Sequence, residues 1–68
     1  MTRDDAEKAL EAGKRLTHTA FSEHEWVECL DKDNYLFEDG CHCSKAEFWN
    51  IRPEAWWNIG WREYYVPA

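Results

Sequence analysis

The sequence of 68 residues has no long apolar run, only three glycines and two prolines, and few cations. No stretch approaches the roughly 20 apolar residues that cross a bilayer, and the first residues lack the apolar centre of a secretory signal, so we expect a cytoplasmic protein without membrane contact. The sequence also lacks a phosphate-binding glycine loop and an ordered catalytic triad, which argues against an enzyme. Eight basic and fourteen acidic side chains give a net charge of -6, and this charge disfavours direct nucleic-acid binding.

Cysteine is scarce and odd in number, whereas disulfide scaffolds use even numbers. Cys41 and Cys43 are separated by a single residue, but structural zinc sites take pairs spaced like C-x2-C. We therefore expect no metal and no other cofactor, and we interpret Cys29, Cys41 and Cys43 as packing residues, since a free thiol behaves as a small hydrophobe. A zinc-stabilised mini-domain stays open as an alternative, because three histidines offer further ligands.

Aromatic residues are abundant, with five tryptophans, three tyrosines and three phenylalanines. A chain of this length buries only about 60% of its unfolded surface, so large rings are an efficient way to build its core. We expect an aromatic core, with the remaining rings at a contact surface. The predicted partner-binding residues are Phe48, Trp49, Trp56 and Trp57.

The hydropathy pattern predicts one α+β domain over residues 1–68. Thr2 and Asp5 form a capping-box pattern and Gly13 is a stop signal, so a helix is expected between them. Period-two alternation then predicts strands over 16–21, 25–31 and 35–37, separated by polar turns. The expected architecture is an N-terminal helix followed by a small, curved antiparallel sheet of meander order, with a short helical turn before the last strand.

The signals conflict between residues 44 and 52. Ser44 and Glu47 repeat the capping-box pattern, but Phe48, Trp49 and Ile51 before a proline suit a strand. We favour a strand over 47–52 that follows a strand holding Cys41 and Cys43. A helical turn over 53–58, with Pro53 at its first position, and a closing strand over 61–66 complete the prediction.

Two adjacent cations, Lys14 and Arg15, follow the predicted helix end. If the sheet closes as expected, they lie near Trp26 or Trp61, where an anion or nucleotide could be held with a ring stacked on its base. Alternatively, they interact with the carbonyls at the end of the helix. His18 is included as a candidate ligand, although a strand histidine is more often half-buried with its hydrogen bonds satisfied.

Three stretches, "ALEAGKRLTHTAF", "EWVECLDKDNYLFEDG" and "GWREY", resemble small phage and prophage proteins related to the Thoeris anti-defence 2 family. The similarity rests on Ala9-Leu10-Glu11, Gly13-Lys14-Arg15, Phe21, Trp26 and Trp61. The resemblance implies a compact, oligomeric, β-rich domain and, for sponge-type relatives, sequestration of a cyclic nucleotide between subunits. It also implies a phage accessory gene, whose product would act in the cytoplasm of the host cell.

We therefore expect a non-enzymatic, homo-oligomeric binding module of phage type that sequesters a small nucleotide-like ligand or a host protein. The competing hypothesis is an acidic inhibitor that binds a basic host protein such as a nuclease or another DNA-binding protein, because a negative surface attracts basic partners.

Overall fold

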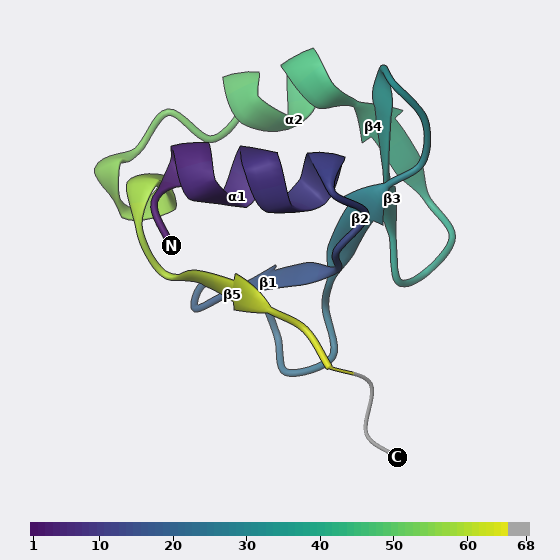
Figure 1. Ribbon diagram of the computed structural model, residues 1–68. Coiled ribbons are helices and arrows are strands. Elements are labelled where there is room, and N and C mark those ends of the chain that lie inside the picture. Colours follow the sequence, from purple (N-terminus) through teal and green to yellow (C-terminus); the bar gives the residue numbers. More distant parts are fainter. Residues whose placement is uncertain (66–68) are drawn as a thin grey trace.

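The computed structural model describes residues 1–65 and contains an N-terminal helix, a five-stranded antiparallel sheet and a second short helix (Figure 1). The elements, in chain order, are α1 (Arg3–Glu11), β1 (Leu16–His18), β2 (Val27–Cys29), β3 (Asn34–Phe37), β4 (His42–Ser44), α2 (Lys45–Asn50), the 3-10 turn η1 (Ala55–Asn58) and β5 (Trp61–Glu63). The predicted α+β class is confirmed, including the helical turn before the last strand. In residues 1–65, no helix is both long and apolar enough to cross a membrane.

Helix α1 begins and ends where the sequence predicts. The Asp5 backbone N–H donates to the Thr2 hydroxyl, and the Asp5 carboxylate accepts from the Thr2 N–H, which completes the capping box. At the other end Gly13 has a φ of +87°, and the Lys14 N–H donates to the carbonyl of Ala9. This is a Schellman ending, which explains why the chain turns at a glycine.

The sheet has the strand order β4-β3-β2-β1-β5, so the first four strands form the predicted meander and β5 returns beside β1. Only one residue pair, Leu16 with Val27, joins β1 to β2, whereas three pairs join β1 to β5. This narrow junction lets the sheet bend around α1 (Figure 1). Strand β1 stops at His18, short of residue 21, because the Phe21 N–H donates to the His18 carbonyl and closes a turn.

The strand predicted over 47–52 is wrong, because Lys45–Asn50 forms helix α2. The Ser44 hydroxyl accepts the Glu47 N–H at 3.1 Å, so the capping signal prevails over the strand propensity of the aromatic residues. The helical turn also starts later than expected, at Ala55 rather than Pro53. The closing strand is present but ends at Glu63, so its predicted extension over residues 64 and 65 is wrong, and residue 66 lies outside the described part of the chain.

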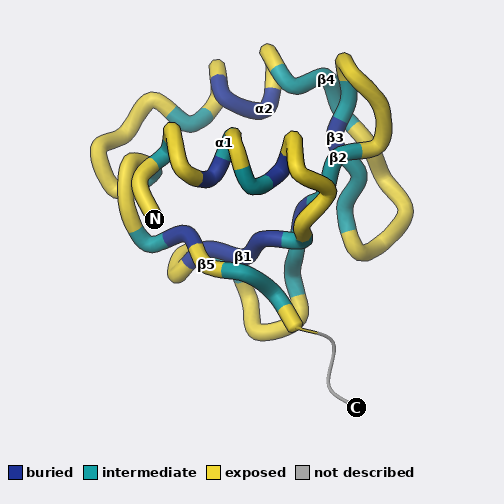
Figure 2. Tube along the Cα trace, in the orientation of Figure 1, coloured by how far each residue is buried: buried dark blue, intermediate teal, exposed yellow. Residues whose placement is uncertain are grey.

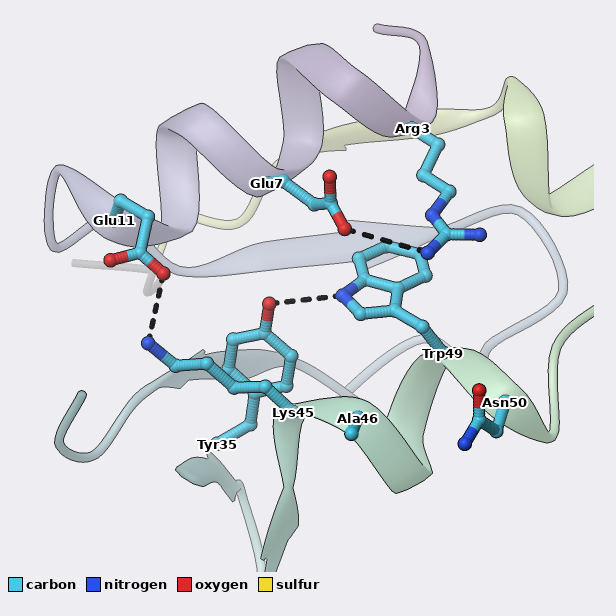
Figure 3. Close-up of a pocket in the computed structure, with 8 residues that line it drawn as sticks. All are labelled: Arg3, Glu7, Glu11, Tyr35, Lys45, Ala46, Trp49 and Asn50. Carbon is cyan, nitrogen blue, oxygen red and sulfur yellow. Dashed lines mark hydrogen bonds and ion pairs between the residues drawn. The ribbon is translucent and has the colours of Figure 1, made fainter. Parts of the chain in front are cut away.

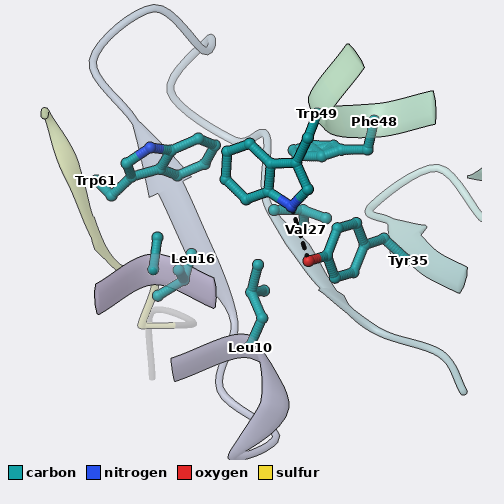
Figure 4. Close-up of a cluster of buried hydrophobic side chains, with 8 residues drawn as sticks. Leu10, Leu16, Val27, Tyr35, Phe48, Trp49 and Trp61 are labelled. Carbon is teal, nitrogen blue, oxygen red and sulfur yellow. Dashed lines mark hydrogen bonds between the residues drawn. The ribbon is translucent and has the colours of Figure 1, made fainter. Parts of the chain in front are cut away.

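The core lies between α1, α2 and the sheet (Figures 2 and 4). Its buried side chains are Ala6, Leu10, Leu16, Val27, Tyr35, Phe48, Trp49 and Trp61. The expected aromatic core is therefore present. Of the three cysteines, Cys43 packs against this core, but Cys41 is exposed at the β3–β4 turn, which corrects its assignment as a packing residue.

Candidate functional site

An open groove of about 450 Å³ separates α1 from α2 (Figure 3). Residues three or four apart on a helix share a face, which is why Arg3, Glu7 and Glu11 all line the α1 side. The α2 side and the floor are formed by Lys45, Ala46, Trp49, Asn50 and Tyr35. The volume falls within the range of small-ligand pockets, roughly 300 to 1,000 Å³.

The floor of the groove is held by one aromatic hydrogen bond. The Trp49 indole N–H donates to the Tyr35 hydroxyl at 3.0 Å, and both side chains are almost fully buried. Burial raises the pKa of the Tyr35 hydroxyl. Because the polar atoms of both rings are engaged with each other, the floor presents mainly apolar ring surface.

The rim of the groove consists of two ion pairs. Arg3 lies 3.6 Å from Glu7 and its guanidinium carbon lies 4.6 Å from the centroid of the Trp49 ring. Lys45 donates to Glu11 at 2.8 Å, and this hydrogen bond raises the pKa of the Lys45 ammonium. Each cation on the rim has a carboxylate partner, so the groove offers no net charge to a ligand.

In the predicted anion site, too, each cation has a carboxylate partner. Arg15 lies over the Trp26 ring, 4.2 Å from its centroid, as the aromatic-cation hypothesis requires. However, Arg15 also donates to Glu28 at 3.2 Å, and Lys14 donates to Glu63 at 2.5 Å. The structure thus brings three of the five predicted ligand residues to one end of the sheet, with both cations already neutralised.

The other two predicted ligand residues, His18 and Trp61, lie in the interior and are only 2% and 3% exposed. His18 Nδ1 accepts the Ala20 N–H at 2.9 Å, which places the ring proton on Nε2. That nitrogen lies 2.6 Å from the Ile59 carbonyl oxygen and 2.9 Å from that of Trp56. Both ring nitrogens are occupied, so His18 ties β1 to the η1 turn instead of facing a ligand.

The predicted partner-binding rings are divided between core and surface. Phe48 and Trp49 are buried and Trp57 is half-buried, whereas Trp56 is 57% exposed. Sequence reasoning missed Ile59, which is 65% exposed in the residue after η1. The sequence did contain a signal, because a glycine directly after an isoleucine indicates a turn, where burial is uncommon. In the structure Gly60 has a positive φ, as such a turn requires.

Arg52 was also missed. Its guanidinium carbon lies 3.9 Å from the centroid of Phe48 and 5.1 Å from that of Trp57, and Nη1 donates to the Phe48 carbonyl. Its Nε is buried without an acceptor, and burial lowers the pKa of the guanidinium. Arg52 therefore packs its guanidinium against the Phe48 and Trp57 rings and leaves one buried donor unsatisfied.

The thiols and potential metal ligands are dispersed. Among residues 1–65, no three His, Cys, Asp or Glu side chains form a cluster suited to a metal ion. The pKa of the Cys41 thiol is raised by its hydrogen bond and charge interaction with Asp39, and burial raises that of Cys43. Both shifts reduce the thiolate fraction, the form that attacks electrophiles and binds metals.

Comparison of the chain with protein-family models, with curated proteins and with solved structures gives no match.

Proposed function

We propose that the protein is a non-enzymatic binding module that recognises a basic surface on another protein. The observation that carries this proposal is the pairing of Lys14 with Glu63 and of Arg15 with Glu28. These two cations were the candidates for holding an anion. With both neutralised, a negative surface is the larger unpaired feature of the molecule.

The wider charge distribution supports the same partner class. Four ion pairs each engage one cation and one carboxylate, so ten of the fourteen acidic side chains but only four of the eight basic ones stay outside an ion pair in residues 1–65. A protein with such a surface attracts cationic partners and accelerates their association.

The biological setting that we propose is the one implied by the resemblance to phage accessory proteins. Such a module would act by occupying a host protein, for example a nuclease or another DNA-binding protein with a basic surface. The raised pKa values of Cys41 and Cys43 favour this binding role over thiol catalysis.

The proposal is tested by capturing partners from host extract on the immobilised protein and measuring the affinity of each purified partner at low and high salt. We expect partners with basic surfaces whose binding weakens as salt rises, because salt screens exposed charges. Acidic partners, or binding that is indifferent to salt, would contradict the proposal.

Two matched triple variants sharpen this test. All six target side chains are exposed and outside any ion pair in the described residues: Glu23→Gln, Glu38→Gln and Glu54→Gln in the first variant, and Lys8→Gln, Lys32→Gln and Arg62→Gln in the second. The first should slow association with the basic partner by about tenfold at low salt. The second should leave association unchanged or make it faster.

A nucleotide-like ligand is the second candidate, favoured by the stacking of Arg15 on Trp26. Its phosphates would have to displace Glu28 and Glu63 from the two cations. A thermal-shift screen with cyclic nucleotides tests this version, and the variant Arg15→Gln is its control. Unchanged unfolding temperatures for the unmodified protein would remove this candidate.

A further inference from the structure

The η1 turn and the residue that follows it carry two exposed large apolar side chains, Trp56 and Ile59. The η1 turn packs beside α1 (Figures 1 and 2). A depression of about 510 Å³ lies between them. It is lined by Thr2, Arg3, Asp4, Glu7, Asn58 and Ile59.

The backbone that presents these side chains is held by hydrogen bonds to buried residues of the core. The carbonyl oxygens of Trp56 and Ile59 both lie within hydrogen-bonding distance of the buried His18 Nε2. The Trp57 carbonyl accepts the Trp61 indole N–H at 2.7 Å. The turn is therefore held by the core, and its exposed side chains start from a defined geometry, which lowers the entropy lost on binding.

The charge of the depression is set by Asp4. Arg3 and Glu7 neutralise each other across 3.6 Å, and Arg3 also lies over the Trp49 ring. Asp4 is exposed and makes no ion pair within residues 1–65. The depression thus combines one carboxylate that has no ion-pair partner in the described residues with the apolar side chain of Ile59.

A long basic side chain matches this combination, because lysine and arginine bury their aliphatic stems on apolar surface and keep the charged end near a carboxylate. The Trp56 ring is exposed on the same turn but lies outside the lining of the depression, so it offers a further contact to a neighbouring apolar residue of the partner. We propose that this depression receives an arginine or lysine side chain from a basic, partly apolar segment of the partner. The inference rests on the proposed function and gives it a location.

The test uses short synthetic peptides with alternating Arg and Leu, and a counterpart with Gln in place of Arg. Binding is followed by fluorescence anisotropy at low salt. The test variants are Asp4→Asn and Ile59→Ser. Their matched controls are Asp33→Asn and Ile51→Ser, which change the same residue types at exposed positions elsewhere, and circular dichroism establishes that all four variants are folded.

We expect the Arg-Leu peptide to bind and each test variant to weaken that binding by about tenfold, while the controls stay within about twofold. Equal effects in test and control variants would overturn the location but leave the proposed function intact, because salt-dependent binding of a basic partner would persist. Equal binding of the Gln peptide would refute a basic occupant. No binding of either peptide would also overturn the inference. If the unmodified protein is a dimer by light scattering and Ile59→Ser is a monomer, a second copy of the chain occupies the depression, which also refutes it.

Discussion

Replacing Gly60 with alanine should destabilise the protein more than the same change at its other two glycines. All three have nearly the same φ, between +86° and +87°. A Cβ atom at Gly13 or Gly40 would meet no atom within 4 Å, whereas at Gly60 it would lie 2.9 Å from Thr19 Oγ1 and 3.1 Å from His18 Nε2. Gly13 and Gly40 therefore control for the backbone strain alone.

The expected magnitude has two parts. An alanine in the left-handed region costs about 1 to 2 kcal/mol at any of the three positions. At Gly60 the Thr19 hydroxyl can rotate away, but His18 is buried and bonded through both ring nitrogens. Displacing it breaks the hydrogen bonding of the buried His18 Nε2, and leaving that donor unsatisfied costs about 1 to 3 kcal/mol more. The free energy of unfolding should therefore fall by about 2 to 5 kcal/mol for Gly60→Ala.

The assay is urea unfolding followed by tryptophan fluorescence, since Trp57 and Trp61 lie 4.4 and 4.7 Å from the His18 ring, centroid to centroid. For a domain of this size, each kcal/mol also lowers the melting temperature by about 4 to 8 °C. If Gly60→Ala loses no more stability than Gly13→Ala and Gly40→Ala, the hydrogen bonds of His18 Nε2 do not hold the turn. The side chain of Ile59 would then not be presented in a defined geometry.

Three further predictions concern titration and burial. Burial raises the pKa of Tyr35, so its contribution to stability is complete below the unfolded value of 10.0 and is lost as pH rises through the higher folded value. The urea midpoint of Tyr35→Phe should therefore fall less steeply above pH 10.0 than that of the unmodified protein. Parallel falls of the two midpoints would contradict this. The pKa of Asp31 is lowered by hydrogen bonds from the Asp33 backbone and the Asn34 side chain. Its contribution to stability is therefore present above the unfolded value of 3.8 and is lost as pH falls through the lower folded value. In Asp31→Ala the loss of stability at acid pH should be smaller in the same assay, and an unchanged loss would refute the assignment. Arg52→Met keeps an unbranched apolar side chain but removes both the guanidinium stacked on Phe48 and the unsatisfied Nε, so thermal unfolding should show a change within about 1 kcal/mol. Arg52→Ala, which also removes the side-chain volume, should lose about 2 kcal/mol. Equal losses in the two variants would show that the guanidinium itself stabilises the protein.

Local chemistry made the first half of the fold predictable. The Thr2 capping box and Gly13 act over three or four positions and mark the ends of α1 in both sequence and structure. The turn residues separate the strands as predicted, although β1 and β2 are shorter than expected. The prediction for residues 44–52 failed because the helix-capping signal of Ser44 and the strand propensity of the aromatic residues disagreed. Helix α2 is also supported by a contact that the strand pattern could not reveal, the Arg52 Nη1 hydrogen bond to the carbonyl of Phe48 one turn earlier.

The candidate sites were harder to predict because they depend on pairs far apart in the chain. Lys14 and Arg15 read as free cations until β5 and β2 bring Glu63 and Glu28 beside them. No period or motif encodes such a pair, since each partner is an ordinary surface residue within its own strand. The interpretation of an anion site was therefore reasonable from the sequence and is weakened only by tertiary contacts.

The distribution of aromatic rings between core and surface indicates what kind of interface the protein can form. Trp49 and Trp61 enter the core because their indole N–H groups find acceptors on Tyr35 and Trp57, and Trp56 has no such partner in residues 1–65. Apart from Trp56 and Ile59, which share one turn, the exposed large apolar side chains of residues 1–65 lie singly in separate segments of the chain. Obligate oligomers bury extensive, strongly apolar interfaces, whereas transient complexes combine small apolar contacts with charge. The distribution thus favours a salt-sensitive encounter with a basic partner over a permanent apolar interface.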